Sequence, residues 1–279
     1  MSADRRAALP PGAVERDVAR WRHGEVDEHA DGVAEEVPVA MSYNGESFAV
    51  MMATPADLDD FALGFALSEG VIAHPGEFGE CRIAQLIEGY EVDVTIPAER
   101  ASALRRRERT LEGRSGCGVC GSRHLEDLVR VPPRVGAGPM ITARVLDRAL
   151  AGMSARQSLA AITGATHAAA WADAHGEILC LREDVGRHNA LDKLIGATTR
   201  AGTAHETGFA VATSRASYEM AMKAASAGIA LFAAVSAPTA LAISLADATG
   251  MTLIGFARPG GCAVYTHPHR FLGTHGGDA

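Results

Sequence analysis

The sequence predicts an α/β protein whose second half contains a partly parallel sheet. Three short apolar runs have the length of buried strands, and two helix-length segments separate them. The predicted strands cover residues 209–213, 229–235 and 251–256, and the predicted helices cover residues 215–227 and 238–249. Glycine follows each helix, as is typical of a helix end. Because strands that alternate with helices need crossover connections, this order predicts neighbouring parallel strands.

The rest of the chain predicts a smaller α+β region ahead of this domain. A hairpin is expected at residues 36–52 around the turn Asn44-Gly45, followed by an apolar helix that begins near Asp57. Two more strands, at 166–171 and 177–181, precede a helix around 188–194. A Pro- and Gly-rich break at 132–139 suggests the boundary. The predicted divisions are a mobile N-terminal arm at 1–34, an α+β region at 35–139 that ends in a cysteine loop, an α/β domain at 140–271, and a tail at 272–279.

The amino-acid composition argues against several functional classes. The 279 residues carry a net charge of −8, which argues against a general nucleic-acid binder. Five cysteines with one close pair do not suggest a disulfide framework, so a reducing cytosol is the expected compartment. The uncharged stretch 224–246 is interrupted by Gly228 and Pro238, and a strand followed by a helix explains it better than a membrane span.

The loops that leave the predicted parallel strands form a candidate binding edge. The carboxyl ends of such strands share one edge of the sheet, where open α/β proteins usually bind ligands. Here the loops cover residues 214–217, 236–239 and 257–261, and they contain hydroxyl groups, Arg215 and Arg258. Hydroxyls, guanidinium groups and backbone amides at helix N-termini suit phosphate groups. Helix caps and turns would explain the same residues.

The segment Cys117-Gly118-Val119-Cys120 allows four interpretations, and the first three meet objections. A zinc site needs a second ligand pair, but Cys81, Cys180 and Cys262 are solitary and the two histidines at 267 and 269 have a poor spacing. A zinc deaminase would have its His-x-Glu motif upstream of the cysteines, whereas here it lies downstream at 175–177. A dinucleotide-binding glycine loop would follow an apolar strand, and residues 105–109 are almost all arginine.

Thiol chemistry is the fourth interpretation. From Arg105 to Arg123 there are six arginines and two glutamates. Cationic surroundings favour the thiolate, which is the reactive form. Four glycines close to the pair would keep the backbone uncrowded. The residues therefore predict a reactive loop cysteine and an anion-binding edge, but they do not identify a substrate.

The chain resembles the formate dehydrogenase accessory sulfurtransferase family, the FdhD family, over residues 36 to 270. The resemblance is carried by ordered motifs at residues 36–39, 60–65, 68–70, 116–121, 183–193, 214–217 and 265–268. It implies a cytoplasmic homodimer whose core is similar to the cytidine deaminase fold without its zinc. It also implies that sulfur passes from a cysteine desulfurase to the bis-molybdopterin guanine dinucleotide cofactor that formate dehydrogenase requires.

The same resemblance assigns the site residues. Cys117 would carry the persulfide, and Cys120 matches the second cysteine of the pair. The cofactor and its guanine nucleotide would be held by the loop after the last strand, which comprises Phe256, Ala257, Arg258, Pro259, Gly260 and Gly261. The position of the strand-end loops adds Ser214 and Arg215 to the expected binding residues. No structural metal, nucleic acid or membrane is expected. A non-catalytic chaperone that delivers the cofactor remains the alternative.

Two further groups of polar residues allow more than one interpretation. The segment 183–193 could line the cofactor site, although i,i+4 pairing and capping would explain its charges equally well. His188 within it is a candidate for a direct chemical role. Glu219 and Lys223 have the spacing of an exposed i,i+4 pair on a helix, and no function is assigned to them.

Overall fold

The computed structural model describes residues 9–111 and 131–273, and its largest element is a six-stranded sheet in the second half. The strand order is β13-β12-β11-β10-β8-β9. The strands β10, β11 and β12 are parallel, as predicted, while β8 runs antiparallel to both of its neighbours and β13 runs antiparallel to β12. The elements of this half are β8 His167–Asp173, β9 Ile178–Asp184, α5 Arg187–Arg200, β10 Gly208–Ala212, α6 Tyr218–Ser226, β11 Leu231–Ala234, α7 Ala240–Thr249, β12 Thr252–Arg258 and β13 Gly261–Val264.

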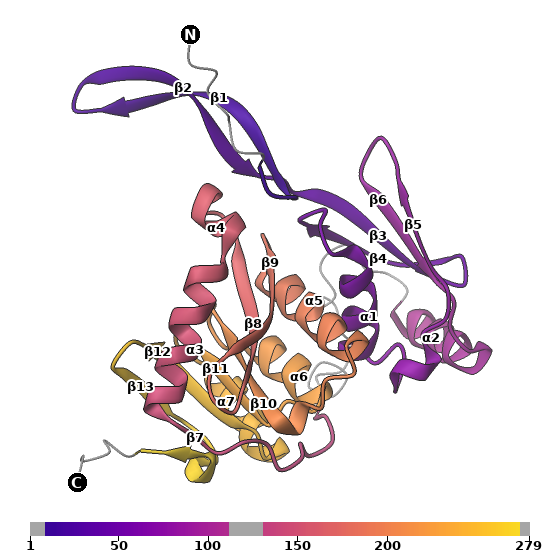
Figure 1. Cartoon of the computed structure of the whole chain (residues 1–279). Coiled ribbons are helices and arrows are strands. Elements are labelled where there is room, and N and C mark those ends of the chain that lie inside the picture. Colours follow the sequence, from indigo (N-terminus) through magenta and orange to yellow (C-terminus); the bar gives the residue numbers. More distant parts are fainter. Residues whose placement is uncertain (1–8, 112–130, 274–279) are drawn as a thin grey trace, which may run out of the picture.

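Helices cover both faces of this sheet (Figure 1). The helices α5, α6 and α7 pack on one face around Trp171, Phe232 and Leu253. On the other face lies α3 (Ala143–Arg156), whose Leu146, Leu150 and Met153 meet side chains such as Phe209 and Ile254. The helix α3 and the short α4 (Ser158–Thr163) after it were not predicted. This is the three-layer arrangement that a largely buried sheet requires.

The first half is a smaller four-stranded sheet with the order β4-β3-β6-β5. The strands β3 (Val37–Tyr43) and β4 (Glu46–Ala53) form the predicted hairpin. Asn44 (φ 53°) and Gly45 (φ 77°) are both left-handed, as a tight hairpin turn requires. The remaining elements of this half are α1 Leu58–Ser68, β5 Cys81–Gln85, β6 Tyr90–Val94 and α2 Ala98–Leu111. Short 3-10 turns occur at Pro75–Glu77, His205–Thr207 and Pro268–Arg270.

The helix α1 joins the two halves. One of its sides packs on the four-stranded sheet through Phe61 and Phe65. Its other side meets α5 so closely that a Cβ atom on Gly64 would lie 1.7 Å from the Asp192 carbonyl oxygen. A Cβ atom on Gly196 would lie 1.9 Å from the Asp60 carbonyl oxygen, so the two helix backbones touch. A helix that is covered on both sides is apolar around most of its circumference, which explains the run Phe61-Ala62-Leu63-Gly64-Phe65.

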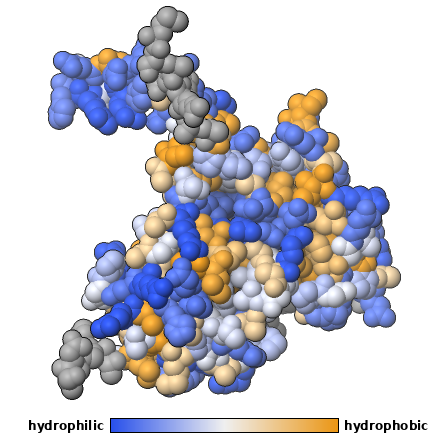
Figure 2. Space-filling view, in the orientation of Figure 1, coloured by the Kyte–Doolittle hydropathy of each residue, from blue (hydrophilic) through white to orange (hydrophobic). Residues whose placement is uncertain are grey.

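The N-terminal arm contains regular secondary structure. No strand is predicted from the sequence before residue 35, but β1 (Ala13–Arg22) and β2 (Glu25–Ala34) form a long antiparallel hairpin. It projects from the body (Figure 1), and its surface is predominantly hydrophilic (Figure 2). Trp21 near its tip is 71% exposed. Because the hairpin buries little on either face, its sequence lacks the alternation that reveals a half-buried strand.

The segment that links the halves is fixed to the second half. Arg270 is buried and donates hydrogen bonds to the carbonyl oxygens of Gly136 (3.0 Å) and Gly250 (2.8 Å). Val135 N donates to Thr249 O at 2.9 Å. The two-residue strands β7 (Ile141–Thr142) and β14 (Phe271–Leu272) pair in parallel. Within residues 9–111 and 131–273, no helix is long and apolar enough to span a membrane.

Candidate functional site

The candidate site is the edge of the large sheet where four strands end together. The carboxyl ends of β9, β10, β11 and β12 point to this edge, since β8 is antiparallel to both β9 and β10. The helices α5, α6 and α7 begin there. Ser217 and Thr239 cap α6 and α7 by accepting hydrogen bonds from Met220 N and Ala242 N. Free amides and the positive ends of helix dipoles make such an edge favourable for anions.

Hydrogen bonds between the loops hold this edge together. Thr239 N donates to Ala216 O at 3.0 Å, which joins the loops after β10 and β11. Phe256 N donates to Ser236 O at 3.1 Å, which joins β12 to the same group. The structure thus brings the predicted residues Ser214, Arg215 and Phe256 onto one edge. The Ser214 side chain is buried and donates to Arg215 O at 3.0 Å, whereas Arg215 is exposed.

Phe256 has an unusual backbone for its residue type. Its φ is 51°, in the left-handed region, and it lies where the pairing of β12 with β13 shifts register between Gly255 and Arg258. Its side chain is 45% exposed, while the next residue, Ala257, is buried. A bulky residue in this region costs energy, and such residues concentrate at functional sites. The bulge presents an aromatic ring to solvent at the candidate edge.

The remaining predicted residues lie in a different kind of loop from the one expected. The sequence predicted that 257–261 would lie next to a helix N-terminus, but Arg258 pairs with Gly261 in a tight turn into the antiparallel strand β13. No helix follows this turn directly. The amide of Gly260 already donates to Asp147 Oδ1 of α3 at 3.1 Å. The turn Arg258-Pro259-Gly260-Gly261 therefore lacks the helix amides that were expected there.

Cys117 and Cys120 lie outside the described residues. The other three cysteines are described and partly buried. Burial raises the pKa of the Cys81 thiol to about 11, and it also raises the pKa of Cys180 and Cys262. These three groups are therefore thiols rather than thiolates at neutral pH, which makes them poor nucleophiles.

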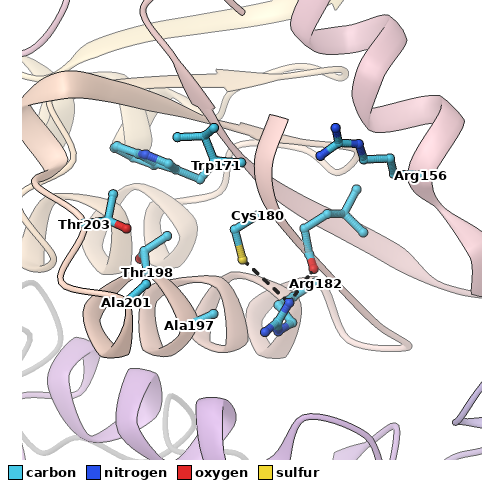
Figure 3. Close-up of a pocket in the computed structure, with 10 residues that line it drawn as sticks. Arg156, Trp171, Cys180, Arg182, Ala197, Thr198, Ala201 and Thr203 are labelled. Atoms are coloured by element: carbon cyan, nitrogen blue, oxygen red, sulfur yellow. Dashed lines mark hydrogen bonds between the residues drawn. The ribbon is translucent and has the colours of Figure 1, made fainter. Parts of the chain in front are cut away.

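A pocket of about 460 Å³ lies elsewhere, between the β8–β9 hairpin and α5 (Figure 3). Cys180 and Arg182 lie between Trp171 on one side and Arg156 on the other. None of the predicted site residues lines it. Its arginines are engaged, since Arg182 binds Asp60 at 2.7 Å and Arg156 binds Glu177 at 3.2 Å. The pocket is separate from the strand-end edge.

The charges of segment 183–193 mostly hold the two halves together. Lys193 Nζ lies 2.7 Å from Asp184 Oδ2, and both side chains are fully buried. Both also bind the backbone of Thr54 in the first half: Thr54 N donates to Asp184 at 3.0 Å, and Lys193 donates to Thr54 O at 2.9 Å. Asn189 donates to Met52 O at 2.8 Å. These side chains bind the end of β4 and the residue that follows it, and the sequence did not predict this role.

The prediction that Glu219 and Lys223 form an exposed pair is wrong. Lys223 is 1% exposed and binds Asp192 Oδ2 at 2.9 Å and Glu69 Oε1 at 2.6 Å. Ser68 Oγ donates to Asp192 Oδ1 at 2.6 Å. Lys223 is buried because α6 lies against the end of α1, a contact between residues about 150 positions apart that no local spacing reveals.

Glu219 instead faces His188 at the candidate edge. His188 Nε2 lies 3.1 Å from Glu219 Oε2, which joins the first turns of α5 and α6. Burial, followed by the charges of Arg187 and Lys223, lowers the pKa of His188 to about 3. Burial raises the pKa of Glu219. His188 is therefore neutral at physiological pH.

The fold and this edge define a class of protein: a three-layer α/β domain with an anion-favouring edge at the carboxyl ends of its parallel strands, joined to a smaller α+β half. The model of the FdhD/NarQ family matches residues 34–272. The chain belongs to the FdhD/NarQ family.

Individual relatives agree with this assignment. A protein of Xanthomonas campestris pv. campestris (strain B100), called sulfur carrier protein FdhD, is 59% identical over 93% of this chain and 92% of its own length. A protein of the same name from Cupriavidus necator is 49% identical over 94% of this chain and 91% of its own length. The crystal structure of a formate dehydrogenase accessory protein from Desulfotalea psychrophila shares the fold, with a TM-score of 0.72 at 23% identity over 94% of this chain and all of that one.

Proposed function

We propose that this chain is a sulfurtransferase that carries sulfur as a persulfide on Cys117. The observation that carries the proposal is the relationship to proteins called sulfur carriers, which extends over more than nine-tenths of both chains at 59% identity. The cysteine pair falls inside the segment 34–272 that the family model matches. The arginines around the pair would favour the thiolate.

The chemistry proposed for Cys117 is thiolate exchange. The donor is a cysteine desulfurase that carries a persulfide. The Cys117 thiolate attacks the outer sulfur of that persulfide, the donor S–S bond breaks, and the donor cysteine leaves as a thiolate. The outer sulfur keeps its oxidation state and is now bonded to Cys117, so no external oxidant or reductant is needed. An acceptor then supplies the electron pair for a new bond to this sulfur, the S–S bond to Cys117 breaks, and Cys117 leaves as a thiolate.

The proposed acceptor is the bis-molybdopterin guanine dinucleotide cofactor, a substrate of this protein that is handed on to formate dehydrogenase. The strand-end edge supports this assignment because it joins Arg215, an exposed aromatic ring at Phe256 and the first turns of three helices. Guanidinium groups and helix amides bind phosphate, and an exposed ring offers a stacking surface for guanine. Cytoplasmic location, a homodimer and a cytidine-deaminase-like core belong to the same proposal.

The first test is direct detection of the persulfide. Incubation with a cysteine desulfurase and cysteine should add one sulfur atom to the wild-type protein at Cys117, measured by mass spectrometry of tryptic peptides. Cys117→Ala should abolish this addition, whereas Cys262→Ala should leave it unchanged, because Cys262 is held as a thiol. Formate dehydrogenase matured in cells with the Cys117→Ala protein should be inactive.

The alternative is a chaperone that delivers the cofactor without transferring sulfur. In that case Cys117→Ala would still activate formate dehydrogenase and would still bind guanine nucleotide. That combination of results would rule out the sulfurtransferase.

A further inference from the structure

The β1–β2 hairpin extends away from the body of its own chain (Figure 1). Each strand has ten residues, which span about 33 Å in extended form. Its base is fixed, because a Cβ atom on Gly12 would lie 2.3 Å from Thr54 and one on Gly32 would lie 2.4 Å from Ile162. A two-stranded hairpin without a packed face is only marginally stable in water. The outer half of this hairpin therefore gains stability if another molecule covers it.

The tip of the hairpin exposes two apolar side chains next to each other. Trp21 pairs with Val26 across the two strands, so both side chains lie on one face, and they are 71% and 58% exposed. Asp17 and Glu28 lie on the same face, at even spacings along β1 and β2. Aromatic side chains often anchor protein interfaces, and burying one removes about 150–250 Å² from water. This face suits a partner that has an apolar pocket with a basic rim.

The pocket between the β8–β9 hairpin and α5 has an apolar wall. Its volume is about 460 Å³, and Trp171, Leu179 and Leu181 line it. Binding pockets in proteins have volumes of about 300–1,000 Å³, so this one can receive a large side chain. Leu179 is exposed, and Arg156 and Arg182 also line the pocket (Figure 3).

The rim of this pocket carries more basic than acidic side chains. Four arginines share three carboxylates there: Arg148 and Arg156 form ion pairs with Glu177, Arg182 and Arg200 form ion pairs with Asp60, and Asp57 lies 3.6 Å from Arg182. One positive charge is therefore in excess. The charges of the rim and of the Trp21 face of the hairpin are complementary.

The hairpin points away from the pocket of its own chain. Its base lies against Thr54, whose amide donates to Asp184 at the end of β9, at 3.0 Å. The pocket lies farther back along β9, at residues 179–182, whereas the tip extends in the direction away from the body. A second copy of the chain is thus the molecule that can bring this tip to this pocket.

We propose that each copy of a homodimer inserts Trp21 and Val26 into the pocket of the other copy, with Glu28 and Asp17 against the arginine rim. The inference rests on the homodimer that belongs to the proposed function, and it names the surfaces that form the interface. A two-fold axis forms the same contact twice, so one chain supplies both sides of the interface.

The test measures self-association of the full-length protein by sedimentation velocity over a series of concentrations. Wild type should form a dimer. Trp21→Ala, and Leu179→Asp in the pocket wall, should each raise the dimer dissociation constant at least about tenfold, because each change affects both contacts. All these side chains are exposed, so the variants should fold. Ile87→Ala, which shortens a fully exposed side chain between β5 and β6, is the control and should dimerise like wild type.

A mixture of the two variants shows whether the hairpin and the pocket are partners. A mixed dimer of Trp21→Ala and Leu179→Asp contains one contact in which both the hairpin and the pocket are intact. The mixture should therefore associate more tightly than either variant alone. A mixture that associates no better than the single variants would overturn the proposal.

Tryptophan fluorescence reports on the same contact. The chain has two tryptophans, and Trp171 is buried, whereas Trp21 is exposed in the single copy. The emission should shift to shorter wavelength as wild type dimerises, because Trp21 leaves water. An unchanged emission on dimerisation would place the interface elsewhere and overturn the proposal.

The proposed interface and the proposed sulfur chemistry can fail separately. Wild type that stays monomeric at every concentration would overturn the interface, and so would a dimer that Trp21→Ala and Leu179→Asp leave unchanged. Cys117→Ala should dimerise like wild type, and Trp21→Ala should still gain the persulfide on Cys117. Loss of the persulfide with these dimerisation results intact would remove only the sulfurtransferase.

Discussion

Phe256 combines a strained backbone with an exposed aromatic side chain. Its left-handed backbone is held by the hydrogen bond from Phe256 N to Ser236 O and by the bulge in β12. Glycine would adopt this conformation without steric cost. Phe256 is almost half exposed, so its side chain contributes little to the core. The proposed function assigns this ring to stacking on guanine.

Two substitutions separate the backbone from the ring. Phe256→Gly should be more stable than Phe256→Ala by about 1 kcal/mol, because only glycine is relaxed at this φ. Both variants should bind guanosine diphosphate about tenfold more weakly, which is the effect expected from the loss of one stacking contact. Urea denaturation and calorimetry would measure the two effects. Full affinity in both variants would exclude Phe256 from the binding site.

At the scale of elements, the crossing of α1 and α5 depends on two glycines. Gly64 and Gly196 each occupy a point where a Cβ atom would overlap a backbone carbonyl group of the other helix. Backbone cannot move aside as a flexible side chain can, because it is fixed by the hydrogen bonds of its helix. The distance between the two halves of the molecule is therefore set by the absence of two side chains.

This contact predicts an unusual response to alanine. Gly64→Ala should lower the free energy of unfolding by about 1–3 kcal/mol or more, although alanine normally favours a helix over glycine. Gly152→Ala in α3 is the matched control, since its Cβ would meet only the Ile178 side chain, at 3.0 Å. Urea denaturation should show the control close to wild type. Equal stability of both variants would contradict the close crossing.

The elements differ in how far the sequence predicts them. The strands β10, β11 and β12 are short apolar runs whose flanking helices end at Gly228 and Gly250, and both glycines have positive φ. Burial on both faces produces such runs, so these strands are predictable. The β1–β2 hairpin buries little and therefore lacks a periodic pattern. A loop at 257–261 was predicted, as Pro259-Gly260 indicates, but the strand β13 after it was not, because four residues are too few to show a strand pattern.

At the scale of the whole molecule, buried charges join the halves. Lys223 on α6 binds Asp192 on α5 and Glu69 at the end of α1. The sequence shows Lys223 four residues after Glu219, a spacing that usually marks a solvated helix face. Only the packing of α1 converts this position into a buried one. The candidate edge was predictable from strand topology, whereas the role of segment 183–193 depends on a contact with Thr54 that no local pattern reveals.

Lys223→Met should destabilise the protein by about 3–5 kcal/mol, because it leaves the buried Asp192 carboxylate without its cation. Adding Asp192→Asn should recover much of that loss, since the neutral amide needs no counter-charge. Urea denaturation of both single variants and the double variant would measure the coupling. Additive losses would show that the two residues do not depend on each other.

The anchoring of both halves has a consequence for the cysteine pair. Cys117 follows the end of α2 at Leu111 by six residues, and the pair precedes the segment that Arg270 fixes to the second half. Six residues of fully extended chain span at most about 20 Å. A persulfide on Cys117 and an acceptor bound by the same molecule would therefore react at an effective concentration that does not depend on the amount of protein in the cell. The second transfer would then behave as an intramolecular reaction, with a rate independent of protein concentration.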